Sequence, residues 1–435
     1  MSTTRGSRRA REERGAVAIL VGILTIVMFT ITALVVDLGM ARVVRREAQV
    51  ASDASSLAAA TALYAHPVYT SGKPPPDFTA AVAAAKGYAA ENYGVTDADW
   101  AGCTDPDALT YQPAGTTCIS FDSATEPTKA RVVVPLRNVK LPFGAVAGAS
   151  SVNVGAYAEA AMQPGGKSEC GLCIIGGGDH VLQNGDVHVS GGSVAFNGNV
   201  SVAHNGEVTS DGYIFVQGTA TTQSGDGYSP DPFTSQPAMP DPLATYPLPS
   251  DFSGLTVHSN PCTDGPGIYG AYNFSNTTCK LTAGLYVITG EWSLTGTAGL
   301  DGTAGVTLYF TCGDASDPQA CSSPGEAGGW LNAAGGGLVN VTAPSSGSTQ
   351  GLAIAYDRLN ISQLELDGNG SSNYVGTVYA YSAKMLYNGN GCTSTSDALI
   401  VVGQMGFDGT NGCLQTNYTK DKNVWVPPSD PHLSE

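Results

Sequence analysis

An uncharged, apolar run lies close to the N-terminus, from Gly15 to Val36. As a helix it spans roughly 33 Å, which is enough to cross a hydrocarbon core of about 30 Å. A secretory signal peptide has a shorter apolar region that ends in a small-x-small cleavage site, whereas this run continues into VVDLGMARVVRRE. The pattern therefore predicts a retained transmembrane helix over residues 15–36, in preference to a cleaved signal peptide or a buried soluble helix.

The residues after this span keep a helical pattern and lack proline from Asp37 to Ala65, so the membrane helix is predicted to continue as a long rod. Small residues recur along the rod at spacings of three and four, which suits close packing against another small-residue helix. That second helix could belong to the same domain or to a partner, and the pattern does not choose between them. The recurring residues are Ala41, Val44, Ala48, Ala51, Ser55 and Ala58.

A second alanine-rich helix is predicted over Phe78–Tyr93, with Asp77 or Thr79 as its N-cap and Gly94 just beyond its end. Strand-like stretches follow it, and the last of them alternates apolar and polar residues. With the rod, these elements predict a small α+β domain over residues 37–162. The four stretches are Cys118–Phe121, Ala130–Leu136, Val139–Phe143 and Val152–Met162.

The pattern changes beyond Pro164-Gly165-Gly166. From residue 180 to 216, pairs of apolar residues recur every six to eight residues, and Asn-Gly or Gly-Gly separates most pairs. Short strands that turn corners around a coil have this pattern. It favours a right-handed parallel β-helix-like solenoid over residues 163–419, with a β-sandwich as the alternative. Seven prolines predict an extended surface insertion at 228–252, and residues 420–435 are expected to form a disordered tail.

Composition and charge narrow the class of protein. The 435 residues include 55 Gly and 25 Pro but only 13% charged residues, which excludes a helical bundle or a coiled coil. The net charge of −17 is uneven, because residues 1–46 hold eight Arg against three acidic residues, whereas the rest of the chain holds 12 bases against 34 acids. An acidic body repels phosphate backbones, so nucleic acid is excluded as a partner. The basic segment 1–14 is expected on the cytoplasmic side.

All ten cysteines follow the apolar span and, taken in order, form five sequential pairs. Disulfides of this kind need an oxidising exterior, so a single-pass protein of the cell membrane is predicted, with a cytoplasmic N-terminus and an extracytoplasmic body. One pair has the CxxC spacing of a zinc half-site or a redox motif, but without a second CxxC a disulfide is favoured. The disulfide candidates are Cys103 and Cys118, Cys170 and Cys173, Cys262 and Cys279, Cys312 and Cys321, and Cys392 and Cys413.

No metal site and no cofactor site is predicted. His180, His188 and His204 are spaced eight and sixteen residues apart and could stack on one face of the solenoid, although outward polar positions are the favoured explanation. Acidic glycine turns such as Asp367-Gly-Asn-Gly370 lack the spacing and the closing carboxylate of a calcium loop.

No catalytic set is predicted either. Parallel β-helices do host enzymes that cleave polysaccharides with paired carboxylates. The nearest candidates here are Asp357 beside Arg358, and Glu365 with Asp367, for which surface ion pairs are the simpler explanation.

The start of the chain, as far as Ala65, resembles the N-terminal segment of the TadG-like proteins of Flp, or tight-adherence, pilus assembly. That family combines an Arg-Gly start, an apolar span, a V-D-x-G exit, and an Arg-rich and Ala-rich helix with the pattern A-x-D-A-x-x-L-A. The matching strings here are Arg14-Gly15, Val36-Asp37-Leu38-Gly39, Arg45-Arg46 and Ala51-Ser52-Asp53-Ala54-Ser55-Ser56-Leu57-Ala58. The positions that the resemblance marks for membrane insertion or assembly are Gly15, Asp37, Gly39, Arg45, Arg46 and Asp53.

Two departures from the family pattern limit what the resemblance implies. Processed pilins of this system carry Glu five residues after the cleaved Gly, whereas Leu20 stands at that distance from Gly15, so prepilin-type cleavage is not expected. Some members carry a von Willebrand A domain whose metal site needs D-x-S-x-S. The nearest string here, which begins at Asp53, ends in Leu57 instead of the last Ser, so no such adhesion site is expected.

The resemblance implies a membrane-anchored, extracytoplasmic structural protein that assembles or anchors a tight-adherence pilus, or a minor or tip component that presents an adhesive surface. Its expected partners are the membrane lipid bilayer, other pilus-assembly or pilin-like membrane proteins, and surface polysaccharide. The alternative is a membrane-tethered β-helix carbohydrate-active enzyme or a polysaccharide-binding surface protein. A groove with two or three convergent carboxylates would favour the enzyme, and flat polar faces would favour the structural role.

Overall fold

The computed structural model describes residues 7–69, 72–144, 148–162, 170–223, 227–333, 337–367, 372–389, 392, 396–408, 412–428 and 431–434. The chain forms two compact units. Unit 1 contains residues 1–65, 76–162 and 429–435, and unit 2 contains residues 66–75 and 163–428. The predicted fold class, a mainly β chain behind a long N-terminal apolar helix, is confirmed.

Unit 1 begins with one continuous helix, α1 (Ser7–Ala62), which joins the apolar run to the rod predicted behind it. The second helix, α2 (Phe78–Tyr93), has the predicted bounds. Asp77 caps it by accepting a hydrogen bond from the backbone N–H of Ala80 at 2.8 Å, and Gly94 ends it in the left-handed region at φ +64°. A short third helix, α3 (Asp97–Ala101), follows.

The small residues of the rod pack inside unit 1. Ala48, Ala51 and Ser55 are fully buried, and α1 packs along α2, whose alanines at 81, 85 and 89 are fully buried as well. Small side chains let the two helix backbones approach closely and fill the space between them without voids. Of the two alternatives for this stripe, packing within the same domain is the one observed for residues 48–59.

An antiparallel sheet completes unit 1, in the order β1-β2-β5-β32. The single strand predicted over Val152–Met162 is wrong, because the chain breaks at Gly155 and its first half pairs with β3 in a separate hairpin. A Cβ on Gly155 would lie 2.7 Å from the side chain of Leu136, so glycine permits this close approach. The strands are β1 (Ile119–Phe121), β2 (Lys129–Val133), β3 (Arg137–Lys140), β4 (Ser151–Val154), β5 (Tyr157–Ala161) and β32 (His432–Ser434).

The structure describes residues 420–428 and 431–434 of the C-terminal segment, which was expected to form a disordered tail. Strand β32 pairs with β5, with His432 opposite Ala161. Val424 and Trp425 are buried within unit 2, after the short 3-10 helix η2 (Lys420–Lys422). Proline keeps such a segment extended, and an extended segment can add a strand to an open sheet edge that lies far away in the sequence.

Unit 2 is built from short strands that pair in parallel with strands about one coil away. Asn199 of β10 lies opposite Asp179 of β7, and Ile214 of β12 lies opposite Val194 of β9, so these pairs are equivalent positions of successive coils. In strands such as β7 and β8 the inward side chains are buried and the outward ones are exposed or half-buried, whereas β9 (Ser193–Phe196) is buried on both faces. These parallel sheets match the predicted solenoid pattern and differ from the antiparallel sheets of a β-sandwich.

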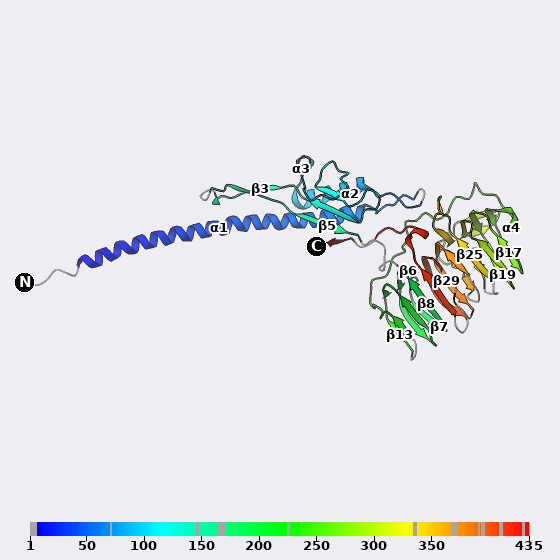
Figure 1. Cartoon of the computed structure of the whole chain (residues 1–435). Helices are drawn as coiled ribbons and strands as arrows, with labels where there is room; N and C mark the ends of the chain where they lie inside the picture. The colour runs from blue at the N-terminus through cyan, green and yellow to red at the C-terminus, as the bar shows by residue number, and fades with distance from the viewer. Residues whose placement is uncertain are drawn as a thin grey trace, which may run out of the picture. The chain divides into compact units, whose positions relative to one another are not determined.

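The coils do not stack in the order of the sequence. The largest sheet has the path β12-β9-β6-β30-β29-β26-β21-β18-β15, so the chain enters in the middle of the stack, builds to one end, and starts again from the other end. Figure 1 shows this as orange-red β29 lying between green and yellow strands. The elements of unit 2 are β6 (Cys170–Ile174), β7 (Asp179–Gln183), β8 (Gly185–Ser190), β9 (Ser193–Phe196), β10 (Asn199–Ala203), β11 (Glu207–Ser210), β12 (Ile214–Val216), β13 (Ala220–Thr222), β14 (Gly227–Ser229), α4 (Pro261–Asp264), β15 (Gly267–Tyr269), β16 (Tyr272–Ser275), β17 (Thr278–Lys280), β18 (Gly284–Ile288), β19 (Glu291–Thr295), β20 (Gly299–Gly302), β21 (Val306–Phe310), β22 (Cys312–Asp314), β23 (Asp317–Gln319), β24 (Trp330–Asn332), β25 (Leu338–Thr342), β26 (Leu352–Tyr356), β27 (Leu364–Asp367), β28 (Asn373–Val375), β29 (Thr377–Asn388), β30 (Ile400–Asp408) and β31 (Gly412–Asn417).

The proline-rich segment 228–252 carries the chain from one end of this stack to the other, so it is a strap and not an insertion within a linear solenoid. Phe233 forms a bridge to Phe215 near one end, Asn197 bonds both backbone groups of Met239, and the ring of Phe252 lies 6.0 Å from that of Tyr309. Seven prolines keep the strap extended. Leu243, Tyr246 and Phe252 anchor it because their side chains are buried against the stack.

Candidate functional site

The apolar N-terminal part of α1 is exposed all round. Its apolar side chains from Val17 to Val36 face outward, with Phe29 72% exposed. Each of its three threonines, Thr25, Thr30 and Thr32, donates its hydroxyl to a carbonyl four residues earlier, at 2.7, 2.8 and 2.9 Å. The helix therefore satisfies its own polar groups and presents hydrocarbon to its surroundings, which is what a bilayer requires. α1 is a candidate membrane span by length and composition.

The residues that the family resemblance marks lie along α1 and differ in what they contact. Asp53 accepts a hydrogen bond at 2.8 Å from Gln49, whose side chain also donates to the backbone oxygen of Tyr157 on β5 at 3.1 Å. Arg45 and Arg46 are exposed. A Cβ added to Gly39 would meet no heavy atom of the described residues within 4 Å, so packing inside the chain does not require glycine there. Gly15 lies inside α1.

Asp37, which directly follows the apolar span, is buried although it is ionisable. Only 3% of it is exposed, and its carboxylate accepts the backbone N–H of Phe143 at 3.1 and 3.5 Å. Phe143 belongs to the loop that joins β3 to β4, so the hairpin reaches back along α1 to the end of the span. The sequence offered no signal for this contact, because the two residues are far apart along the chain.

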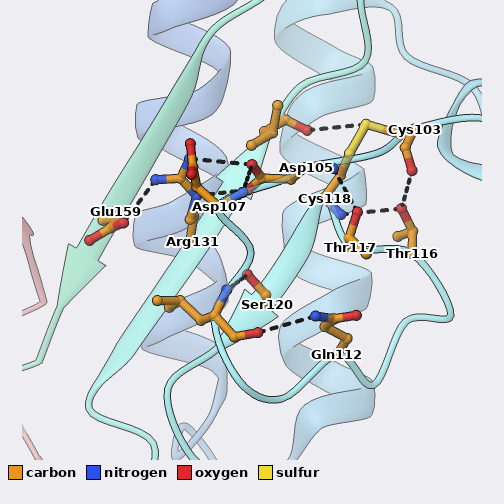
Figure 2. A network of polar contacts seen from close by, with 12 residues as sticks. Cys103, Asp105, Asp107, Gln112, Thr116, Thr117, Cys118, Ser120, Arg131 and Glu159 are labelled. Atoms are coloured by element: carbon orange, nitrogen blue, oxygen red, sulfur yellow. Dashed lines mark hydrogen bonds and ion pairs between the residues drawn. A yellow bond between two sulfur atoms is a disulfide. The ribbon is translucent and has the colours of Figure 1, made fainter.

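A buried arginine connects the strands of unit 1. Arg131 on β2 forms ion pairs with Asp105 at 2.7 Å and with Glu159 on β5 at 2.9 Å (Figure 2). Its guanidinium also lies 4.2 Å from the ring centroid of Tyr157. The hydrogen bond to Asp105 raises the pKa of Arg131, so the guanidinium stays charged. Figure 2 also shows the disulfide between Cys103 and Cys118 beside this cluster, which holds the loop that carries Asp105.

The cysteines pair as predicted, in five sequential disulfides. Cys312, Cys321 and Glu326 lie close enough together to suggest a metal site. The two sulfurs are bonded to each other, so they are not thiolate ligands. Glu326 instead accepts the backbone N–H groups of Ser322 and Ser323, and the first of these bonds lowers its pKa. The cluster is a closed loop, not a site for a cation.

The three histidines do not form a ladder. His180 is 2% exposed, and its Nε2 lies 2.7 Å from the carbonyl of Asn197 and 3.0 Å from that of Gly176. His188 pairs with the hydroxyl of Thr209 on the next coil, and His204 is exposed in a turn at φ +56°. Successive strands lie on different faces of the coil, and the coil repeats over a different spacing, since His180 lies opposite Val200. Spacings of eight and sixteen therefore do not bring the three side chains onto one face.

Asp357 and Arg358 have structural partners. Asp357 is 8% exposed and accepts the hydroxyl of Tyr309 at 3.1 Å. Arg358 donates to the carbonyl oxygens of Leu243 and, at 2.8 Å, of Tyr246, and so it holds the proline-rich strap on the stack. The second candidate pair is only partly described, since the side chain of Asp367 lies outside the described residues.

Glu365 on β27 is half-buried, and burial raises its pKa. Hydrogen bonding from Gln363 opposes this shift, whereas the carboxylates of Asp408 and Glu291 add to it. These carboxylates come from three different coils and sit on the outward side of β19, β27 and β30.

We expect Glu365→Gln to change how stability depends on pH. A carboxyl whose pKa is raised in the folded state stabilises the fold below its unfolded pKa, and this contribution is lost as the pH rises through the folded pKa. The free energy of unfolding of the variant, relative to the wild type, should therefore increase as the pH rises above about 4, near the ordinary pKa of glutamate. Urea unfolding at several pH values measures it. Glu207→Gln removes an exposed carboxylate and serves as the control. A course of Glu365→Gln parallel to that of the wild type would contradict the expectation.

The comparison with protein families matches the N-terminal helix. The family model described as "Putative Flp pilus-assembly TadE/G-like" covers residues 15–62, which lie within α1 and include both the apolar span and the packed rod. No curated protein and no solved structure matches the chain. Residues 15–62 thus form a Tad segment, similar to the TadE/G-like segments described for Flp pilus assembly.

Proposed function

We propose that this chain is a membrane-anchored structural protein of a tight-adherence pilus, with its N-terminus in the cytoplasm and its body outside. It would assemble or anchor the pilus, or form a minor or tip component of it. The observation that carries the proposal is that the Tad match ends at Ala62, the last residue of α1. One helix therefore holds the membrane span and, without a break, the rod that packs into unit 1.

The disulfides support the external position of the body. Five bonds distributed over both units need an oxidising compartment, and the first of them, between Cys103 and Cys118, already lies well beyond the apolar span. A cytoplasmic body would expose all ten cysteines to reducing conditions.

The charged residues described above bond other groups of the chain, which supports a structural role over the catalytic alternative. Asp357 bonds Tyr309, Arg358 holds the strap, and Arg131 joins strands of unit 1. A glycosidase needs two carboxylates that face one substrate bond. Asp357, the buried member of the candidate pairs, faces its own loop, where it also accepts the backbone N–H of Leu359 at 3.0 Å.

Deletion of the gene in its host tests the proposal. Surface pili, counted by electron microscopy, and adhesion should be lost in the deletion strain and restored by the full-length chain. Mechanical shearing then separates the two versions of the role, since a pilus component is recovered in the sheared fraction and an assembly factor stays with the cells. Unchanged pili and adhesion would contradict the proposal. The orientation is tested by joining a reporter that works only in the cytoplasm after Glu435, and activity of this reporter would overturn the proposed orientation.

A further inference from the structure

The hairpin of β3 and β4 follows α1 down to the end of the apolar span (Figure 1). Just above the hairpin, Gln49 bonds the backbone of Tyr157. At residues 143 and 144, called the hairpin tip below, Asp37 bonds the backbone of Phe143. The positions of Gln49 and Asp37 on one helix correspond to a separation of about 18 Å along its axis. The hairpin is a sheet of only two strands, and such a sheet is marginally stable in water unless another surface covers it.

The tip of the hairpin is held at the level where the span ends. Asp37 is the first residue after Val36, and its buried carboxylate accepts the N–H of Phe143 at 3.1 Å. The next residue, Gly144, is in a tight turn, because an added Cβ would lie 2.4 Å from the carbonyl oxygen of Ala149 and 3.3 Å from the carboxylate of Asp37. The backbone at residues 143 and 144 is therefore held close to the Asp37 carboxylate.

The side chains near the tip suit the boundary between hydrocarbon and water. Phe143 is 50% exposed and Val152 is 38% exposed, and aromatic rings are enriched at the headgroup level of membranes. Residues 37–46 and 138–154 hold four basic residues and one acidic residue, within a chain whose net charge is −17. This local excess of positive charge attracts anionic phospholipids. The four are Arg42, Arg45, Arg46 and Lys140.

An open groove of about 720 Å³ continues the apolar surface of the span up α1, opposite the 152–155 segment of the hairpin. Val35 and Leu38 line its lower part, and Arg42 and Arg45 line its upper part. A phospholipid at a membrane surface offers the same order of groups, with acyl chain below and phosphate above.

We propose that the hairpin tip is a membrane-surface contact, in which the ring of Phe143 enters the headgroup region of a bilayer that contains anionic phospholipid. Asp37 acts as a positioning residue that holds the tip against α1. This inference rests on the proposed role of residues 15–36 as a membrane helix. It also assigns a positioning role to Asp37, the Asp of the V-D-x-G string.

Tryptophan fluorescence in reconstituted vesicles tests the contact. The full chain carrying Phe143→Trp is placed in vesicles of phosphatidylcholine and phosphatidylglycerol, whose acyl chains are either plain or brominated near the headgroup end. The emission added by the new tryptophan, after subtraction of the wild-type signal, should be lost in the brominated vesicles. Tyr157→Trp is the matched control, because Tyr157 is also an exposed aromatic residue of unit 1 but its backbone bonds Gln49, about 18 Å further from the span. Its emission should be retained.

The role of Asp37 has its own variant. Adding Asp37→Asn to Phe143→Trp weakens the bond to the backbone N–H of residue 143, so part of the lost emission should return. An unchanged loss would overturn the positioning role of Asp37.

Flotation with the vesicles separates the two proposals. A chain that does not float with lipid contradicts the membrane helix itself. A chain that floats but whose Phe143→Trp emission is quenched no more than that of Tyr157→Trp contradicts the membrane contact alone. If that unquenched emission is shifted to the blue, a second copy of the chain or another protein covers the tip, which likewise overturns the contact with lipid.

Discussion

Arg131→Met is expected to lower the free energy of unfolding of unit 1 by about 3 to 5 kcal/mol, because it removes one partner of a buried ion pair and leaves the other charged. The side chains of Arg131 and Asp105 are only 7% and 4% exposed, and Glu159, 25% exposed, shares the same guanidinium. Methionine keeps most of the apolar stem, so the loss reports the charge and its hydrogen bonds and not a cavity.

Hydrogen–deuterium exchange followed by mass spectrometry locates this effect. Exchange should accelerate in β1, β2 and β5 and stay unchanged in unit 2. Lys129→Met changes an exposed residue two positions earlier on the same strand, and it should alter stability by less than about 0.5 kcal/mol. Adding Asp105→Asn to Arg131→Met should recover part of the loss, since no unpaired charge then remains at that position. Wild-type protection in Arg131→Met would show that the ion pairs contribute nothing.

Asn360→Ala is expected to destabilise unit 2 by about 3 kcal/mol or more, since each buried backbone group left without a partner costs about 1 to 3 kcal/mol. Asn360 is fully buried between β26 and β27. Its side-chain oxygen accepts the N–H groups of Gly328 and Ser362 at 2.9 and 3.0 Å, and its amide donates to the carbonyl of Gly329 at 2.9 Å. One side chain thus joins the segment before β24 to the segment before β27.

Thermal unfolding and hydrogen exchange measure the consequence of this change. The segments at 328–332 and 360–364 should lose protection first, because their backbone groups lose the shared partner. Asn273→Ala removes an amide from an exposed position on β16 and serves as the control. Equal stability of the two variants would mean that water replaces the Asn360 side chain at no cost.

Local elements followed from the sequence because short-range physics determines them. The limits of α2 depend on Asp77 and Gly94, whose capping chemistry acts within one turn of the helix. The sequential disulfides were predictable for a similar reason, since neighbouring cysteines close short loops. Within the helix, the three threonines bond the carbonyls that lie one turn before them.

Long-range pairings did not follow from the sequence. The pattern of apolar pairs indicates short strands, but it is the same whether coils stack in chain order or in the observed order that begins in the middle. Pro-rich segment 228–252 crosses the stack, whereas the segment after η2 ends in strand β32 of unit 1. The local sequence of an extended segment does not indicate which sheet edge the segment will pair with.

The sequence by itself determined that this protein has a candidate membrane-spanning helix continued by a rod, a Tad segment, and a β-rich acidic body closed by disulfides, because hydrophobic length, periodicity and cysteine order act along the chain. Only the tertiary structure decided which charges are buried and where the hairpin tip lies. Arg131 meets Asp105, and Asp37 meets Phe143, across 26 and 106 residues. Such contacts form because folding removes these groups from water together, and a single sequence does not record which groups share that burial.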